Sequence, residues 1–207
     1  PVIFLTSATS DITCLSTALK LAQNKKWKNE IRALPIAHLS SNASIDHYIS
    51  NTCAKAEIIV VRFLGSRSHW SYGFEQLILW QLEKKNRNLI VVSGTESSAN
   101  DLQDISSLPQ KSIDLIQILL NQGGVNNYNY MLKILEKIKY HKEINLDSKL
   151  IEYHEDLIKW KWKKSNNPSV AVFLYKSLLH LIMRLILQGP NLLFALLYKL
   201  SLHCIIV

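Results

Sequence analysis

The segment Ile58–Phe63 (IIVVRF) constrains the fold more than any other part of the sequence. A continuous apolar and β-branched run of this length is typical of a strand in a parallel sheet that is covered on both faces. Similar runs occur at Val2–Thr6 and at Leu89–Ser93, where Gly94 ends the run, and Ile31–Pro35 is a further candidate strand. We therefore predict four strands.

Amphipathic segments separate these strands. A helix capped by Ser10 is predicted through about Lys26, and one capped by Ser44 through about Lys55. Tyr72–Asn86 is predicted as a third helix. Because strands and helices alternate, the sequence predicts a doubly wound α/β fold, with a mainly parallel sheet, flanking helices and right-handed crossovers.

A helical segment follows the alternating region. Three helices are predicted in it: Asn100–Ser107, Lys111–Gln122 and Tyr128–Tyr140. The last of them is expected to be capped by Asn126 or Asn127. We predict that residues 1–141 form one α/β domain with trailing helices, and that residues 142–169 form a polar linker with some helix around Ile151–Trp162.

The remainder, residues 170–207, is predicted to begin a second region, with Val170–Tyr175 as its first strand. Beyond it the sequence is an apolar C-terminal tail without acidic residues, which we interpret as a truncated or frameshifted end. Leu178–Tyr198 is long enough to cross a bilayer. A central Arg184 and Gly189–Pro190 are costly there, so the sequence disfavours a membrane segment.

The formal charge of +8 does not indicate a nucleic-acid surface. Residues 157–207 hold seven basic and no acidic residues, so the excess is confined to the end of the chain. Cys14, Cys53 and Cys204 lie far apart and give neither a disulfide framework nor metal-ligand spacing. We expect reduced thiols and a cytoplasmic protein.

The loop and helix that follow Ile58–Phe63 carry the candidate site. In open α/β sheets, ligands bind at the carboxyl ends of the strands. Arg62 or Arg67 could meet a carboxylate, and Trp70 and Tyr72 could offer flat surface to a macrocycle. The predicted ligand-binding residues are Arg62, Gly65, Arg67, His69, Trp70, Tyr72, Gly73 and Glu75.

A structural role for the same residues stays open. Trp70 and Tyr72 could plug the end of the sheet, and Arg62 could pair with Glu75 within the chain. We predict no catalytic residue and no metal site, because the seven histidines show no paired spacing. No Walker motif occurs either.

This segment resembles the large subunit of aerobic cobaltochelatase, a relative of the magnesium chelatase large subunit. The family pattern Arg-x-Leu-Gly-Gly…Tyr-Trp-x-Tyr-Gly…Glu-x-Leu is matched by Arg62, Leu64, Gly65, Trp70, Tyr72, Gly73, Glu75 and Leu77. Ser66 and His69 depart from it. Further similar motifs follow in order at Val2–Asp11, Asp101-Leu102, Ser107–Pro109, Gly123-Gly124, Asn127, Met131-Leu132 and Val170–Tyr175, so the resemblance covers about residues 1–177.

The resemblance implies a fragment of the subunit that binds a tetrapyrrole, hydrogenobyrinic acid diamide, for cobalt(II) insertion in cobalamin biosynthesis. It implies AAA+-type partner subunits that hydrolyse ATP, and no cofactor held by this chain itself. Family chains are several times longer, so we expect this chain to be inactive alone. Three alternatives stay open: a stand-alone α/β binding or docking module without catalysis, a magnesium chelatase large-subunit fragment, and a membrane-tethered protein.

Overall fold

A computed structural model describes residues 1–23, 29–94, 102, 104–142, 148–153, 170–171 and 205–206. The chain divides into two compact units, Pro1–Glu152 and Tyr153–Val207. The first unit contains the predicted α/β region together with the helices that follow it.

A four-stranded parallel sheet organises the first unit. Its strands are β1 (Val2–Thr6), β2 (Ile31–Pro35), β3 (Ile58–Phe63) and β4 (Asn88–Ser93), in the order β2-β1-β3-β4. All three strand pairs are parallel. The predicted parallel sheet is confirmed, and β1, β2 and β3 span the predicted residues. The apolar runs reflect burial, since every residue of β1 and β3 is buried.

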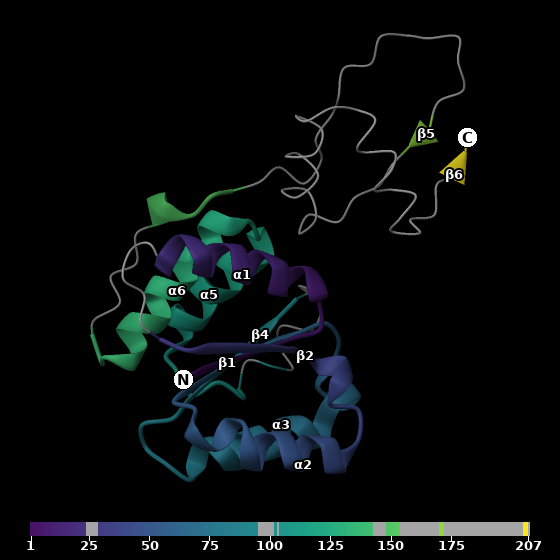
Figure 1. The fold of residues 1–207 in the computed structure, drawn as a ribbon, viewed down its shortest axis with the longest axis vertical. Coiled ribbons are helices and arrows are strands. Elements are labelled where there is room, and N and C mark those ends of the chain that lie inside the picture. The colour runs from purple at the N-terminus through teal and green to yellow at the C-terminus, as the bar shows by residue number, and fades with distance from the viewer. Residues whose placement is uncertain are drawn as a thin grey trace. The chain divides into compact units, whose positions relative to one another are not determined.

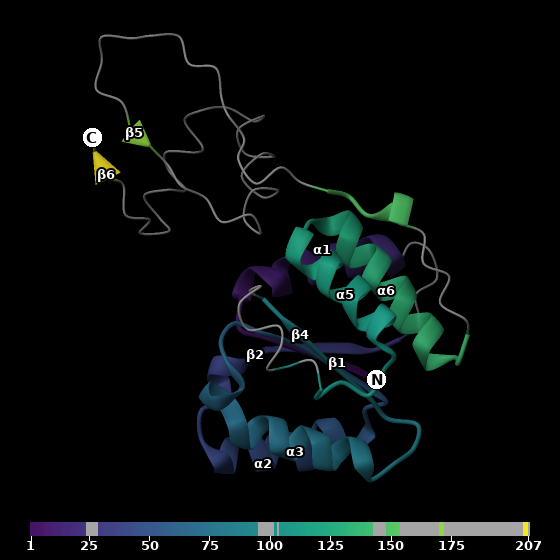
Figure 2. The same cartoon turned by 180° about the vertical axis from the view of Figure 1, so that it is seen from behind.

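Helices cover both faces of this sheet (Figures 1 and 2). On one face lie α1 (Thr9–Gln23), α5 (Gln110–Gln122) and α6 (Val125–Lys139), and on the other lie α2 (Asn42–Asn51) and α3 (Ser71–Leu82). The doubly wound arrangement is therefore confirmed. Side chains alternate along β3, so that Val60 packs toward α1, α5 and α6, whereas Val61 packs toward α2 and α3.

Two predicted helix starts were wrong by a few residues. The cap of α2 is Ser41 and not Ser44, because Ser41 Oγ accepts a hydrogen bond from the Ser44 amide while the Ser41 amide donates to Ser44 Oγ. Ser44 is thus the third helical residue of a capping box. Helix α1 begins at Thr9, so Ser10 lies inside it. The predicted end of α1 near Lys26 lies outside the described residues.

Helix α3 begins at Ser71 and ends at Leu82, four residues before the predicted end at Asn86. The buried Arg87 explains the early end. Its guanidinium donates to the carbonyl oxygens of Trp80 (2.5 Å) and Ala54 (3.0 Å), and it pairs with Glu83 at 2.6 Å. These bonds satisfy a carbonyl at the end of the helix and turn the chain into β4.

Helix α6 begins at Val125 with Gly124 as its cap, so the predicted capping by Asn126 or Asn127 was wrong. Gly124 has a φ of 80°, in the left-handed region that glycine adopts without strain. Helix α5 starts at Gln110, one residue before its predicted start.

The edge of β4 is closed by the segment that precedes α5. Ser106 Oγ accepts from the Val91 amide (2.8 Å) and donates to the Val91 carbonyl (3.1 Å). Ser107 makes the same pair of contacts with Leu89 through its hydroxyl, and its amide also donates to the Leu89 carbonyl. The predicted helix Asn100–Ser107 was wrong over residues 104–107, which are not helical, whereas Leu102, the other described residue of that range, is helical.

In the second unit the structure describes two short strands, β5 (Val170–Ala171) and β6 (Ile205–Ile206), which pair antiparallel. The predicted helix around Ile151–Trp162, the rest of the strand Val170–Tyr175 and the apolar segment Leu178–Tyr198 lie largely outside the described residues. The predicted boundaries at residues 141 and 169 stay predictions. Among the described helices, none has the length and apolar character needed to cross a bilayer.

Candidate functional site

The strand order places the candidate loop at a topological switch point. From β1 the chain crosses to β2 on one side, then returns past β1 to reach β3 and β4 on the other side. The order therefore reverses between β1 and β3. In open α/β sheets the carboxyl ends of the two strands at this reversal flank the usual ligand crevice.

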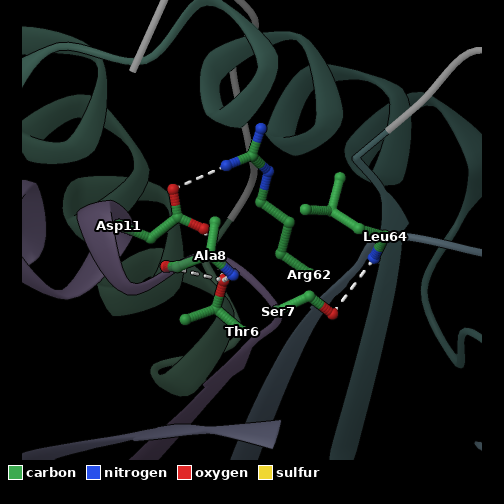
Figure 3. A network of polar contacts seen from close by, with 6 residues as sticks. All are labelled: Thr6, Ser7, Ala8, Asp11, Arg62 and Leu64. Atoms are coloured by element: carbon green, nitrogen blue, oxygen red, sulfur yellow. Dashed lines mark hydrogen bonds and ion pairs between the residues drawn. The ribbon is translucent and has the colours of Figure 1, made fainter. Parts of the chain in front are cut away.

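A buried ion pair lies at this edge of the sheet (Figure 3). Arg62, at the end of β3, is 8% exposed, and Asp11, in the first turn of α1, is 1% exposed. Arg62 Nη1 lies 2.5 Å from Asp11 Oδ1, and Thr6 Oγ1 donates to Asp11 Oδ2 at 2.5 Å. Both carboxylate oxygens are thus bonded, at a helix end whose dipole favours negative charge.

The predicted pairing of Arg62 with Glu75 was wrong. Arg62 follows Ile58 and Val60 at every second position of β3, so its side chain points to the face covered by α1, α5 and α6. Glu75 lies on α3, which covers the opposite face, and its side chain is exposed. Strand alternation therefore keeps the two residues apart.

Two further side chains surround the ion pair. The hydroxyl of Tyr128, on α6, is buried without a hydrogen-bond partner, and so is Nε of Arg62. Burial, and then the nearby Asp11 carboxylate, raise the pKa of Tyr128 well above its usual value. The same two causes raise the pKa of the Cys14 thiol. Tyr128 and Cys14 are neutral here, so Asp11 and Arg62 balance each other's charge.

Short polar contacts also join the ends of β1 and β3. The amide of Ser7 donates to the carbonyl of Arg62 at 3.0 Å. Ser7 Oγ accepts from the amide of Leu64 at 3.1 Å (Figure 3). These bonds continue the strand pairing by one residue and fix where the loop after β3 departs. The bonds that fix the start of the loop therefore lie at the same strand ends as the ion pair.

The structure packs Trp70 and Gly73 into the core. Trp70 ends the short 3-10 helix Arg67–Trp70, and its Nε1 donates to the Leu39 carbonyl at 3.0 Å. Its ring stacks on Phe63 with centroids 6.2 Å apart and meets Phe74 edge-on at 5.2 Å. A Cβ on Gly73 would lie 2.2 Å from this ring. The Trp70 ring, predicted as a flat surface for a macrocycle, is therefore covered by Phe63, Phe74 and Gly73.

The other candidate residues lie at or near the surface. The side chains of Arg67 and His69 are exposed, and His69 Nδ1 accepts from the Ser66 amide at 3.2 Å. Gly65 has a φ of 132°, which only glycine adopts readily. Tyr72 donates to Asp46 Oδ1 at 2.8 Å, and this hydrogen bond raises the pKa of Tyr72.

The predicted set thus divides into three groups. Arg62 is buried in an ion pair, Trp70 and Gly73 are buried in the core, and the remaining residues line the surface of the loop and of α3: Gly65, Arg67, His69, Tyr72 and Glu75. Sequence reasoning missed Asp11 and Tyr128. The signal for Asp11 was available, since an acid in the first turn of the helix after β1 lies at the carboxyl edge of the sheet. Within the described residues, no cluster of three or more His, Cys, Asp or Glu side chains could hold a metal ion.

Comparison with known proteins gives one match by sequence and one by fold. No protein-family profile matches the chain. Over 97 residues, 47% of its length, the chain is 29% identical to the aerobic cobaltochelatase subunit CobN of Pseudomonas aeruginosa. The chain is CobN-like. It covers 8% of that relative.

The fold of the CobN-like chain also matches a solved structure. It superimposes on the catalytic subunit of cobaltochelatase from Mycobacterium tuberculosis with a TM-score of 0.53 and 18% identity, over 81% of this chain and 12% of that one. At this identity the structural match supports the shared fold. The likeness to CobN rests on the sequence match.

Proposed function

We propose that the CobN-like chain serves in metal insertion into a tetrapyrrole, as an α/β region of a cobaltochelatase-type large subunit. The observation that carries the proposal is the 29% identity to the Pseudomonas aeruginosa cobaltochelatase subunit. The substrates of such a complex would be a corrin precursor of cobalamin biosynthesis and cobalt(II). AAA+-type partner subunits would supply the energy by hydrolysing ATP, and the complex would act in the cytoplasm.

The contribution of this chain would be binding and positioning. The exposed cationic side chain of Arg67 and the imidazole of His69 lie in the short 3-10 helix that follows β3, the strand that carries the buried ion pair of Arg62 with Asp11. Carboxylates on the rim of a corrin precursor suit an exposed guanidinium that can donate two parallel hydrogen bonds. The exposed residues would meet the ring substituents.

Ring binding is tested by titrating hydrogenobyrinic acid diamide into the 207-residue chain and following its visible absorbance. We expect a saturable spectral shift, and a roughly tenfold weaker affinity in Arg67→Ala, because charge-assisted hydrogen bonds are worth about 1.5–3 kcal/mol. Lys84→Ala is the matched control, since Lys84 is an exposed cation beyond the end of α3, away from this loop. A chain that gives no spectral shift contradicts ring binding.

Metal insertion requires a separate assay. We expect the CobN-like chain alone to insert no cobalt into the precursor in the presence of ATP, because it covers 8% of the matching relative. Insertion measured by the absorbance of the metallated product, with this chain as the sole protein, would contradict that expectation. Cell fractionation tests the proposed cytoplasmic location.

A specific observation favours a second candidate function, a docking module without contact to the ring. Trp70 is covered by Phe63, Phe74 and Gly73, which removes the largest flat surface from the candidate loop. Under this alternative, Arg67 and His69 would meet another protein surface. The absorbance titration separates the two functions, because a docking module leaves the spectrum of the precursor unchanged.

A further inference from the structure

Asn127 is a fully buried polar residue whose side chain leaves its own helix. It lies in the first turn of α6 with 0% exposure. Its Nδ2 donates to the carbonyls of Glu152 (2.7 Å) and Gly123 (2.8 Å), and its Oδ1 accepts from the Glu152 amide at 2.8 Å. A helix cap accepts from helical amides, whereas this side chain donates to carbonyls. Asn127 therefore has another role.

The bonds to Glu152 reproduce the pairing of a sheet residue. The backbone amide and the backbone carbonyl of Glu152 both form hydrogen bonds with the side-chain amide of Asn127, as they would with a residue of a neighbouring strand. The segment that these bonds hold, residues 148–152, is here called the exit strap. It begins with the 3-10 turn Ser148–Leu150 and ends at Glu152, the last residue of the first unit.

Ile151 also anchors the exit strap, since its side chain is buried in the core formed with α1, α5 and α6. Breaking the contacts to Glu152 would leave the buried Oδ1 of Asn127 without a partner and its Nδ2 with the Gly123 carbonyl alone, which is costlier than losing an exposed hydrogen bond. The polar contacts therefore help to hold the strap on the first unit.

We propose that Asn127 is an amide latch that holds the exit strap on α6 and so sets the point at which the chain leaves the first unit. Release of the latch frees residues 148–152 while the sheet and its helices stay folded. Local opening of this kind is expected where a short segment is held by few buried contacts. The latch depends on hydrogen-bond geometry and not on charge.

Hydrogen exchange of the 207-residue chain tests the latch. Asn127→Asp keeps the shape but replaces the two donors with a carboxylate facing two carbonyls. We expect peptides covering 148–153 to exchange at least about tenfold faster, with peptides of β1 and β3 unchanged. Asn126→Asp is the matched control, because Asn126 is exposed beside it on the same turn. It should leave exchange in the strap unchanged.

A second variant acts from the strap and leaves α6 intact. Glu152→Pro removes the amide that Asn127 Oδ1 accepts from, whereas Glu152→Gln keeps it. The proline variant should accelerate exchange in the strap, and the glutamine variant should not. The latch is refuted if the strap exchanges at the wild-type rate in Glu152→Pro. It is also refuted if Asn127→Asp accelerates exchange equally in β1 and β3.

Discussion

The guanidinium of Arg62 and the carboxylate of Asp11 form a buried ion pair across 51 residues of sequence. The pair joins the carboxyl end of β3 to the first turn of α1, at the point where the strand order reverses. Open α/β sheets bind ligands near this reversal, and here two side chains of the chain pair with each other at that edge. The pair is therefore a structural link between β3 and α1.

Removing one partner of this pair should destabilise the first unit strongly. Arg62→Met leaves Asp11 buried with Thr6 as its remaining side-chain partner, and we expect a loss of about 3–5 kcal/mol in the free energy of unfolding. Urea denaturation followed by circular dichroism measures this loss. Arg67→Met, an exposed arginine five residues later, should cost less than about 0.5 kcal/mol.

A double variant separates the ion pair from simple packing. Asp11→Asn combined with Arg62→Met removes both charges, so we expect it to be more stable than the sum of the two single losses predicts, by about 1–3 kcal/mol. Additive losses in the same urea experiment would mean that the two charges do not interact in the folded protein.

Gly73→Ala should destabilise the protein through Trp70. The added Cβ would lie 2.2 Å from the indole ring, which is held by Phe63, Phe74 and the hydrogen bond to Leu39. We expect a loss of about 1–3 kcal/mol and a changed near-ultraviolet circular dichroism spectrum. Ser71→Ala, at the exposed start of the same helix, is the control. A Gly73→Ala protein with wild-type stability would contradict the packing described here.

The edge of β4 should become a site of self-association when its cover is lost. Ser106→Ala leaves the amide and carbonyl of Val91 without the hydroxyl that pairs with both. We expect a loss of about 1–3 kcal/mol and concentration-dependent dimers in analytical ultracentrifugation, because an open strand edge pairs with other chains. The exposed Ser68→Ala should stay as monomeric as the wild-type chain.

The stability of the first unit should fall at alkaline pH because of Cys53. Burial raises the pKa of this thiol from 9.0 to about 12, so the folded state holds a proton that the unfolded state releases. The stabilisation is complete below pH 9 and is lost as the pH rises toward 12. Tyr48, whose pKa burial raises to about 12, acts in the same direction from pH 10.

Urea titrations at pH 8 and pH 10.5 measure this dependence. Between these two pH values, the free energy of unfolding of Cys53→Ala should fall by roughly 1–2 kcal/mol less than that of wild type. Ile45→Val removes buried apolar volume from the same core cluster without removing a titrating group, so its pH dependence should match that of wild type. An unchanged pH dependence in Cys53→Ala would show that the thiol does not contribute.

Local patterns in the chain were enough to find the strands and the parallel sheet. Apolar runs such as Ile58–Phe63 require burial on both faces, and the helices between them leave few ways to connect the strands. Helix ends were predicted less well. A helix end depends on which backbone groups a side chain reaches after folding. This decided that Ser41 and not Ser44 caps α2, and that Arg87 ends α3.

The roles of the candidate residues were decided by the tertiary structure. Arg62 could be recognised as a strand-end arginine, but its partner depends on which strand lies beside β3 and which helix covers that face. Trp70 could be recognised as an aromatic in a loop, but only its neighbours Phe63 and Phe74 show that its ring is covered. Burial and pairing are relations between segments distant along the chain, and local periodicity carries no information about them.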